Sequence, residues 1–152
     1  MELSGALARA RPASPDGDAT ATPDAELARD LPEVVDEVAT AFALYEQALV
    51  DRDLATMAGC FVEGESVVRF GIADRQRGAD ELASWRAAQD PLPPGRSLFE
   101  TSVATFGTSF GVVTTCISYP RRPTVGRQSQ TWVRFPDGWR IVHAHVSEVV
   151  GP

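Results

Sequence analysis

The feature that most limits the possible folds of this chain is a strongly patterned stretch near its C-terminus, residues 126–147, with the sequence GRQSQTWVRFPDGWRIVHAHVS. Two runs of alternating side chains flank Pro136, Asp137 and Gly138, a combination typical of a tight turn between strands. The pattern therefore predicts a β-hairpin. We expect the rest of the chain to be organised around it.

Side chains alternate between the two faces of a strand, so each strand of this hairpin presents a defined set to each side. In the first strand one face carries Gln128, Gln130, Trp132 and Arg134. In the second strand strict alternation places together Trp139, Ile141, His143, His145 and Ser147. Pairing of the two strands can bring these faces together. They carry large rings, two amides and both histidines of the chain, a composition that suits a pocket wall. Polar side chains on a half-solvated sheet fit the same period.

The length and charge of the chain restrict its class. At 152 residues it is long enough for one domain with a substantial core and short for two. Its 14 basic residues are all arginine and stand against 21 acidic ones, for a net charge of −7. This balance argues against nucleic-acid or anionic-membrane binding and favours a small-molecule or protein partner. The absence of lysine excludes Schiff-base chemistry and a Walker-type phosphate loop.

Cellular location and domain limits follow from the remaining composition. Cys60 and Cys116 lie far apart in apolar surroundings, which is typical of buried thiols rather than of a disulfide framework. The N-terminus lacks the apolar run of a secretory signal, and no segment approaches the ~20 apolar residues of a membrane span. We therefore expect a cytoplasmic protein. Residues 1–30 show no sustained apolar period and are expected to form a disordered tail before a single domain over 31–152.

The first predicted helix begins after Leu31 with Pro32 in its first turn and continues to about Leu49. Its apolar stripe consists of Val34, Val35, Val38, Phe42, Tyr45 and Leu49. A buried phenol seeks a hydrogen-bond partner, so the Tyr45 hydroxyl is expected to point toward a polar group, although an ordinary core tyrosine fits the same spacing. Asp53 is suited to cap a short second helix over 54–61.

Arg69 is the unusual residue of the next predicted strand, 66–70. A guanidinium between Val68 and Phe70 is costly to bury unless it meets an anion or several acceptors, and an arginine that snorkels to the surface is the alternative. A third helix over 79–88, with Trp85 facing inward, and strands over 97–106 and 110–119 precede the hairpin. This order predicts an α+β fold with helices against one face of a curved sheet, whose concave side can hold a ligand.

Four of these segments together resemble the AtzH-like family, which includes the oxalurate-catabolism protein HpxZ. They are ALYEQAL around Tyr45, VVRFG around Arg69, ELASWRAA around Trp85, and the hairpin itself, within a match over roughly residues 32–149. The family belongs to the SnoaL-like, nuclear-transport-factor-2-like superfamily. The resemblance therefore implies a cone-shaped, cystatin-like α+β barrel with a pocket between sheet and helices, usually as a homodimer.

The resemblance also implies an activity: decarboxylating amidohydrolysis of a small carboxylated urea, of the type that converts 1,3-dicarboxyurea to allophanate, without metal or organic cofactor. Tyr45 and Arg69 match the family's proposed catalytic pair. The other expected pocket residues are Trp85, Gln128, Gln130, Trp132 and His145. His143 and His145, two positions apart on a strand with no third ligand at a recognised spacing, do not indicate a metal site.

Two other functions fit the sequence. The superfamily often uses the same pocket for small-carboxylate binding or dimerisation without chemistry, and the HpxZ relationship points to oxalurate or another ureido acid. Gln89 stands where the family often has a basic residue, and His143 stands where relatives tend to have a small one. The exact substrate and the role of His143 are therefore left open at this stage.

Overall fold

A computed structural model describes residues 27–151 of the chain. Most of the predicted tail, 1–26, lies outside the described residues. Ala28, Arg29 and Asp30, which were also assigned to the tail, are attached to the domain instead. Arg29 forms an antiparallel bridge with Phe106, and the backbone N–H of Asp30 donates to the carbonyl of Thr105 at 3.1 Å. Ordered structure thus begins before position 31.

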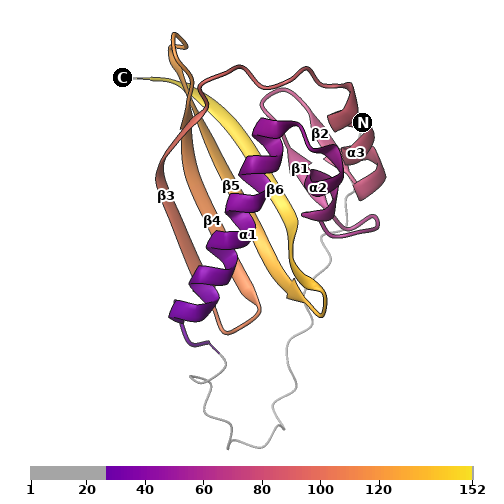
Figure 1. Ribbon diagram of the computed structural model, residues 1–152, viewed down its shortest axis with the longest axis vertical. Helices are drawn as coiled ribbons and strands as arrows, with labels where there is room; N and C mark the ends of the chain where they lie inside the picture. Colours follow the sequence, from indigo (N-terminus) through magenta and orange to yellow (C-terminus); the bar gives the residue numbers. More distant parts are fainter. Residues whose placement is uncertain (1–26, 152) are drawn as a thin grey trace, which may run out of the picture.

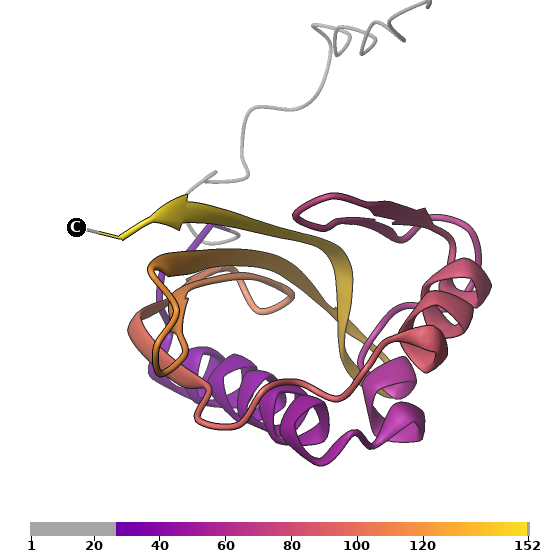
Figure 2. The same cartoon turned by 90° about the horizontal axis from the view of Figure 1, so that it is seen from above.

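The described chain contains three helices and six strands. In order they are α1 (Pro32–Asp51), α2 (Leu54–Gly59), β1 (Val68–Phe70), β2 (Arg75–Arg77), α3 (Ala79–Ala88), β3 (Ser97–Phe106), β4 (Phe110–Ser118), β5 (Thr124–Phe135) and β6 (Gly138–Val150). The strands form one sheet in the order β2-β1-β6-β5-β4-β3, and only β1 and β6 pair in parallel. The sheet is curved and not closed, and α1 lies across its concave face (Figures 1 and 2). The predicted α+β fold is confirmed.

Helix α1 forms as its apolar spacing predicts. It has Pro32 in its first turn, and it buries Val34, Val38, Phe42, Tyr45, Glu46, Ala48 and Leu49. The helix ends at Asp51 and is followed by the capping residue Arg52, which adopts the left-handed conformation (φ 54°). Asp53 then caps α2 by accepting the Thr56 backbone N–H at 3.0 Å, so that the two helices meet in a corner beside β1 (Figure 1).

Strand β2 was not predicted, and the sequence pattern explains why. Its three residues read Arg-Gln-Arg, with Gln76 buried and both arginines exposed. A short, polar edge strand carries no apolar alternation, so it looks like a loop in the sequence. Its antiparallel pairing with β1 sets Gln76 opposite Arg69.

The terminal hairpin forms around Gly138, whose φ of 127° favours glycine, but its two strands do not pair in simple register. Trp132 is opposite Ile141 and Thr131 is opposite His143, so Val142 is an extra residue, a β-bulge. Beyond the bulge the faces exchange: Ala144 is buried in the core, whereas His145 is exposed. The predicted faces of His143, His145 and Ser147 are therefore wrong, because strict alternation does not allow for the additional residue.

The core lies between α1 and the concave face of the sheet. Its most deeply buried apolar side chains include Val38, Trp132 and Ile141, each 0% exposed. Cys60 is also buried, and burial raises the pKa of its thiol; Cys116 is half-buried, and neither cysteine is in a disulfide. Within residues 27–151, no helix combines the length and the apolar character that crossing a bilayer requires.

Candidate active site

A cavity of about 350 Å³ lies between the helices and the concave face of the sheet. Residues of all three helices line it, together with Arg69 of β1, the segment 89–96 and residues near the ends of β4, β5 and β6. This volume is typical of pockets that bury small organic ligands. Several polar side chains point into an otherwise largely apolar space, and they fall into two groups.

The first group is centred on Tyr45. Its side chain is 3% exposed and its ring packs edge-on against Phe61, with centroids 5.7 Å apart. The hydroxyl oxygen accepts a hydrogen bond from Arg86 Nη2 at 2.9 Å. Because the donor in this bond is the guanidinium, the O–H of Tyr45 itself is left to donate to a ligand. Arg86 was not predicted as a site residue, although the Trp85-Arg86 pair is part of the segment that resembles the family.

Arg69 belongs to the same group and is held in place from three sides. Its guanidinium stacks over the Trp85 ring at 4.1 Å from the centroid. Nη1 donates to Asp74 Oδ1 at 2.9 Å and to Gln76 Oε1 at 2.8 Å. Gly71 permits this arrangement, since a Cβ at that position would overlap both the Asp74 carboxylate and Arg69 Nη1. The loop and the unpredicted strand β2 therefore supply both acceptors of Arg69.

Charge is incompletely balanced at this end of the cavity. The Arg69 side chain is only 11% exposed; burial lowers its pKa, and the nearby positive charge of Arg86 lowers it further, while Asp74 opposes the shift. Among residues 27–151, Arg86 forms no ion pair. Two guanidiniums thus share one end of the cavity with a single paired carboxylate. An anionic ligand bound there would be stabilised by both.

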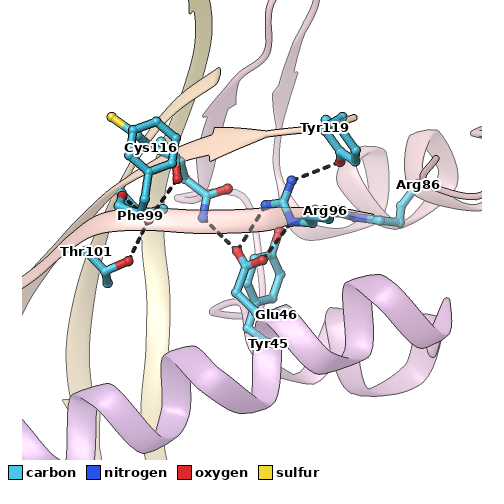
Figure 3. A network of polar contacts seen from close by, with 10 residues as sticks. Tyr45, Glu46, Arg86, Arg96, Phe99, Thr101, Cys116 and Tyr119 are labelled. Carbon is cyan, nitrogen blue, oxygen red and sulfur yellow. Dashed lines mark hydrogen bonds and ion pairs between the residues drawn. The ribbon is translucent and has the colours of Figure 1, made fainter. Parts of the chain in front are cut away.

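The second polar group is a closed network that ties α1 to the sheet (Figure 3). Glu46 Oε2 accepts from Arg96 Nε at 2.9 Å, and its Oε1 accepts from Arg96 Nη2 at 3.2 Å and from Gln128 Nε2 at 2.9 Å. Arg96 Nη1 donates to the Tyr119 hydroxyl at 3.1 Å. Burial alone would lower the pKa of Arg96, but the bonds and charge of Glu46 outweigh it and raise that pKa. This group is neutral as a whole.

The predicted site residues do not all meet in the cavity. Four of them line it: Tyr45, Arg69, Trp85 and Gln128. The side-chain amide of Gln128 donates a hydrogen bond to Glu46.

Gln130 and Trp132 were expected in the pocket wall, but they lie in the core. They are 1% and 0% exposed, and Trp132 Nε1 donates to Gln130 Oε1 at 3.1 Å. His145 is exposed on the outer side of the sheet, beyond the bulge and beside His143. Both imidazoles pack edge-on against Phe70, with ring centroids 5.9 Å apart. Neither histidine lines the cavity.

Four polar residues of the site were missed: Glu46, Arg86, Arg96 and Tyr119. A weak signal existed for Glu46, because it follows Tyr45 on the edge of the apolar stripe, where a buried carboxylate requires a partner. Arg96 lies just before one predicted strand and Tyr119 is the last residue of another, and neither had a pattern that marked it. Within residues 27–151, no cluster of three or more His, Cys, Asp or Glu side chains is arranged to hold a metal ion.

Comparison with known proteins gives a consistent assignment. The sequence model of the AtzH-like family matches residues 28–151. A cystatin-like fold protein from Burkholderia xenovorans is 42% identical, with a TM-score of 0.80 over 83% of this chain and 99% of that one. A protein of the DUF3225 family from Pectobacterium atrosepticum is 35% identical, with a TM-score of 0.78 over 84% and 98%.

More distant structures share the fold alone. An NTF2-like protein from Pseudomonas putida is 15% identical, with a TM-score of 0.64 over 76% of this chain and 86% of that one. A search among curated proteins gave no significant match.

Proposed function

Because this chain belongs to the AtzH-like family, we propose that it is a decarboxylating amidohydrolase that acts on a small carboxylated urea, of the type that converts 1,3-dicarboxyurea to allophanate. One observation supports this proposal above the others. The phenol of Tyr45 accepts a hydrogen bond from Arg86, which leaves its own O–H free to donate. It lies at the same end of the cavity as the guanidinium of Arg69, which stacks on Trp85. Such a site combines anion binding with a proton donor.

The geometry suggests a division of roles. The free N–H groups of Arg69 bind the carboxylate of an N-carboxylated urea, in the plane that Trp85 fixes by stacking. When the N–C bond breaks, the carboxylate leaves as CO₂ and the electron pair remains on nitrogen, which must gain a proton. The Tyr45 hydroxyl supplies that proton, and solvent returns one. Each turnover therefore consumes one proton and yields CO₂ and the free amide nitrogen.

Arg86 assists the same step through the oxygen of Tyr45. Its hydrogen bond, 2.9 Å long, stabilises the negative charge that this oxygen acquires when its proton moves to the substrate. Glu46, the next residue of α1, is fixed by Arg96 and Gln128 and so sets the rotation of the helix at Tyr45. Glu46 is a positioning residue in this proposal.

The experiment measures CO₂ release from 1,3-dicarboxyurea and from oxalurate by the purified protein. Positioned acids typically contribute about 10²–10⁴-fold, so Tyr45→Phe is expected to lower kcat by about a hundredfold or more while the circular dichroism spectrum is unchanged. Arg69→Ala should lose activity mainly through a raised KM. The chain's only other tyrosine provides a matched control: Tyr119→Phe removes a hydroxyl from the neutral network and should cost much less. Full activity in both Tyr45→Phe and Arg69→Ala would refute the assignment.

A binding module without chemistry is the second candidate, and the positive charge of Arg69 and Arg86 in excess of the single Asp74 carboxylate favours it equally. Calorimetry with malonate and ureido acids separates the two functions. Binding that disappears in Arg69→Ala, from a wild-type protein that releases no CO₂, would support the binding module.

A further inference from the structure

We propose that the natural ligand of this cavity carries an apolar substituent in addition to its anionic ureido end. The substrate class would then be N-carboxylated ureas with a hydrocarbon substituent, rather than unsubstituted 1,3-dicarboxyurea. The anionic half of this inference rests on the proposed function. The apolar half rests on three separate features: the size of the cavity, the distribution of charge in its lining, and the apolar side chains at its rim.

The cavity is larger than the smallest candidate substrate needs. Its volume is about 350 Å³. Pockets above about 300 Å³ commonly enclose drug-sized molecules, whereas 1,3-dicarboxyurea has only about ten non-hydrogen atoms. A ligand of that size held at Arg69 and Tyr45 would leave much of the cavity to water.

The excess of positive charge in the lining comes from Arg69 and Arg86, beside Tyr45. The other charges of the lining are matched in number. Arg96 is paired with Glu46 inside the neutral network. The exposed part of the lining then carries two positive and two negative residues, namely Arg52, Arg122, Asp90 and Glu148. The charges of the lining other than those of Arg69 and Arg86 thus cancel in number, which leaves a net attraction for one anionic group beside these two arginines.

The remaining lining is largely hydrocarbon. Its inner wall includes Leu49, Met57 and Ile117, which are 9%, 3% and 4% exposed. Its rim includes Leu54, Ile72 and Leu92, which are 38%, 59% and 37% exposed.

Large apolar side chains that remain exposed around a cavity usually mark a surface that a ligand or partner covers. A hydrocarbon group attached to the anionic end would bury both the inner wall and the rim. Burying a leucine-sized group is worth roughly tenfold or more in affinity.

Calorimetry on the full chain with a series of N-carbamoyl amino acids tests this inference. N-carbamoylglycine, N-carbamoyl-leucine and N-carbamoyl-phenylalanine share one anionic ureido end and differ only in the side group. We expect the Kd to fall about tenfold or more from the glycine to the leucine compound. Arg86→Gln should weaken all three alike, and Leu92→Asn should weaken only the two apolar compounds.

Three results would overturn the inference. The first is equal or weaker binding of the leucine compound, and the second is malonate as the tightest ligand. The third is that Leu92→Asn lowers self-association, measured by analytical ultracentrifugation, without changing the ratio of affinities; a second copy of the chain would then be what covers the rim. The test is independent of turnover. If dicarboxyurea is decarboxylated while the series is flat, only this inference fails, and if the series behaves as expected without turnover, only the catalytic proposal fails.

Discussion

The ion pair between Glu46 and Arg96 gives the most direct test of how α1 is held against the sheet. Its side chains are 10% and 9% exposed, and Glu46 accepts three hydrogen bonds, two from Arg96 and one from Gln128. Glu46→Gln removes the negative charge and replaces one acceptor oxygen by an NH₂ group that faces a donor. The buried guanidinium then lacks its counter-charge.

The expected loss follows from this burial. Removing one partner of a buried ion pair typically costs about 3–5 kcal/mol, against about 0–1 kcal/mol for an exposed pair. Arg96 keeps its bond to Tyr119 and lies at the cavity, so the lower end, about 3 kcal/mol, applies to Glu46→Gln. For a chain of this size, each kcal/mol of lost stability lowers Tm by about 2–4 °C, so Tm should fall by roughly 6–12 °C.

Urea unfolding followed by circular dichroism measures this loss. A matched control lies on the same helix: Glu37 pairs with Arg134 and accepts from Trp139 Nε1 at 2.8 Å, but its ion pair is largely exposed, so Glu37→Gln should destabilise much less. The double change Glu46→Leu with Arg96→Met should recover most of the stability, because no buried charge remains. The reasoning is refuted if Glu46→Gln costs no more than Glu37→Gln, or if the double variant is less stable than the single one.

Two further outcomes are expected. Hydrogen bonds from the Thr56 side chain and backbone lower the pKa of Asp53, so its stabilising effect is present at neutral pH and is lost as the pH falls through that lowered pKa. The Tm difference between wild type and Asp53→Ala should therefore shrink in acid, and a constant difference would contradict this. Trp132→Ala should cost about 3–5 kcal/mol in urea unfolding, whereas Trp85→Ala should cost less but weaken malonate binding; equal losses of stability would contradict the core position of Trp132.

Much of the fold was predictable because its elements depend on local patterns. The spacing of Val34, Val38 and Phe42 indicates a helix with one buried face, and the turn signal at Asp137 and Gly138 locates the hairpin. Strand β2 escaped prediction because its stability comes from pairing with β1 and from the contacts of Gln76, not from apolar residues.

The candidate site was only partly predictable for a similar reason. Tyr45 and Arg69 are conspicuous in sequence because each is polar within an apolar run. Arg86 is on a short helix with a weak apolar stripe, where an arginine is usually solvated, so only its contact with Tyr45 identifies it. His145 was placed on the wrong face because bulges arise from local backbone geometry and leave no reliable trace in hydrophobic alternation.

The bulge at Val142 has a practical consequence for anyone who intends to alter ligand preference. Beyond it, the cavity-facing positions of β6 are Val146 and Glu148, whereas His145 and Ser147 face outward. Beyond the bulge, a saturation library that follows strict alternation from Trp139 would randomise outward-facing positions and leave the cavity untouched. Deleting Val142 would remove the extra residue and restore plain alternation, with Ile141, Ala144 and Val146 still facing inward and both histidines still facing outward.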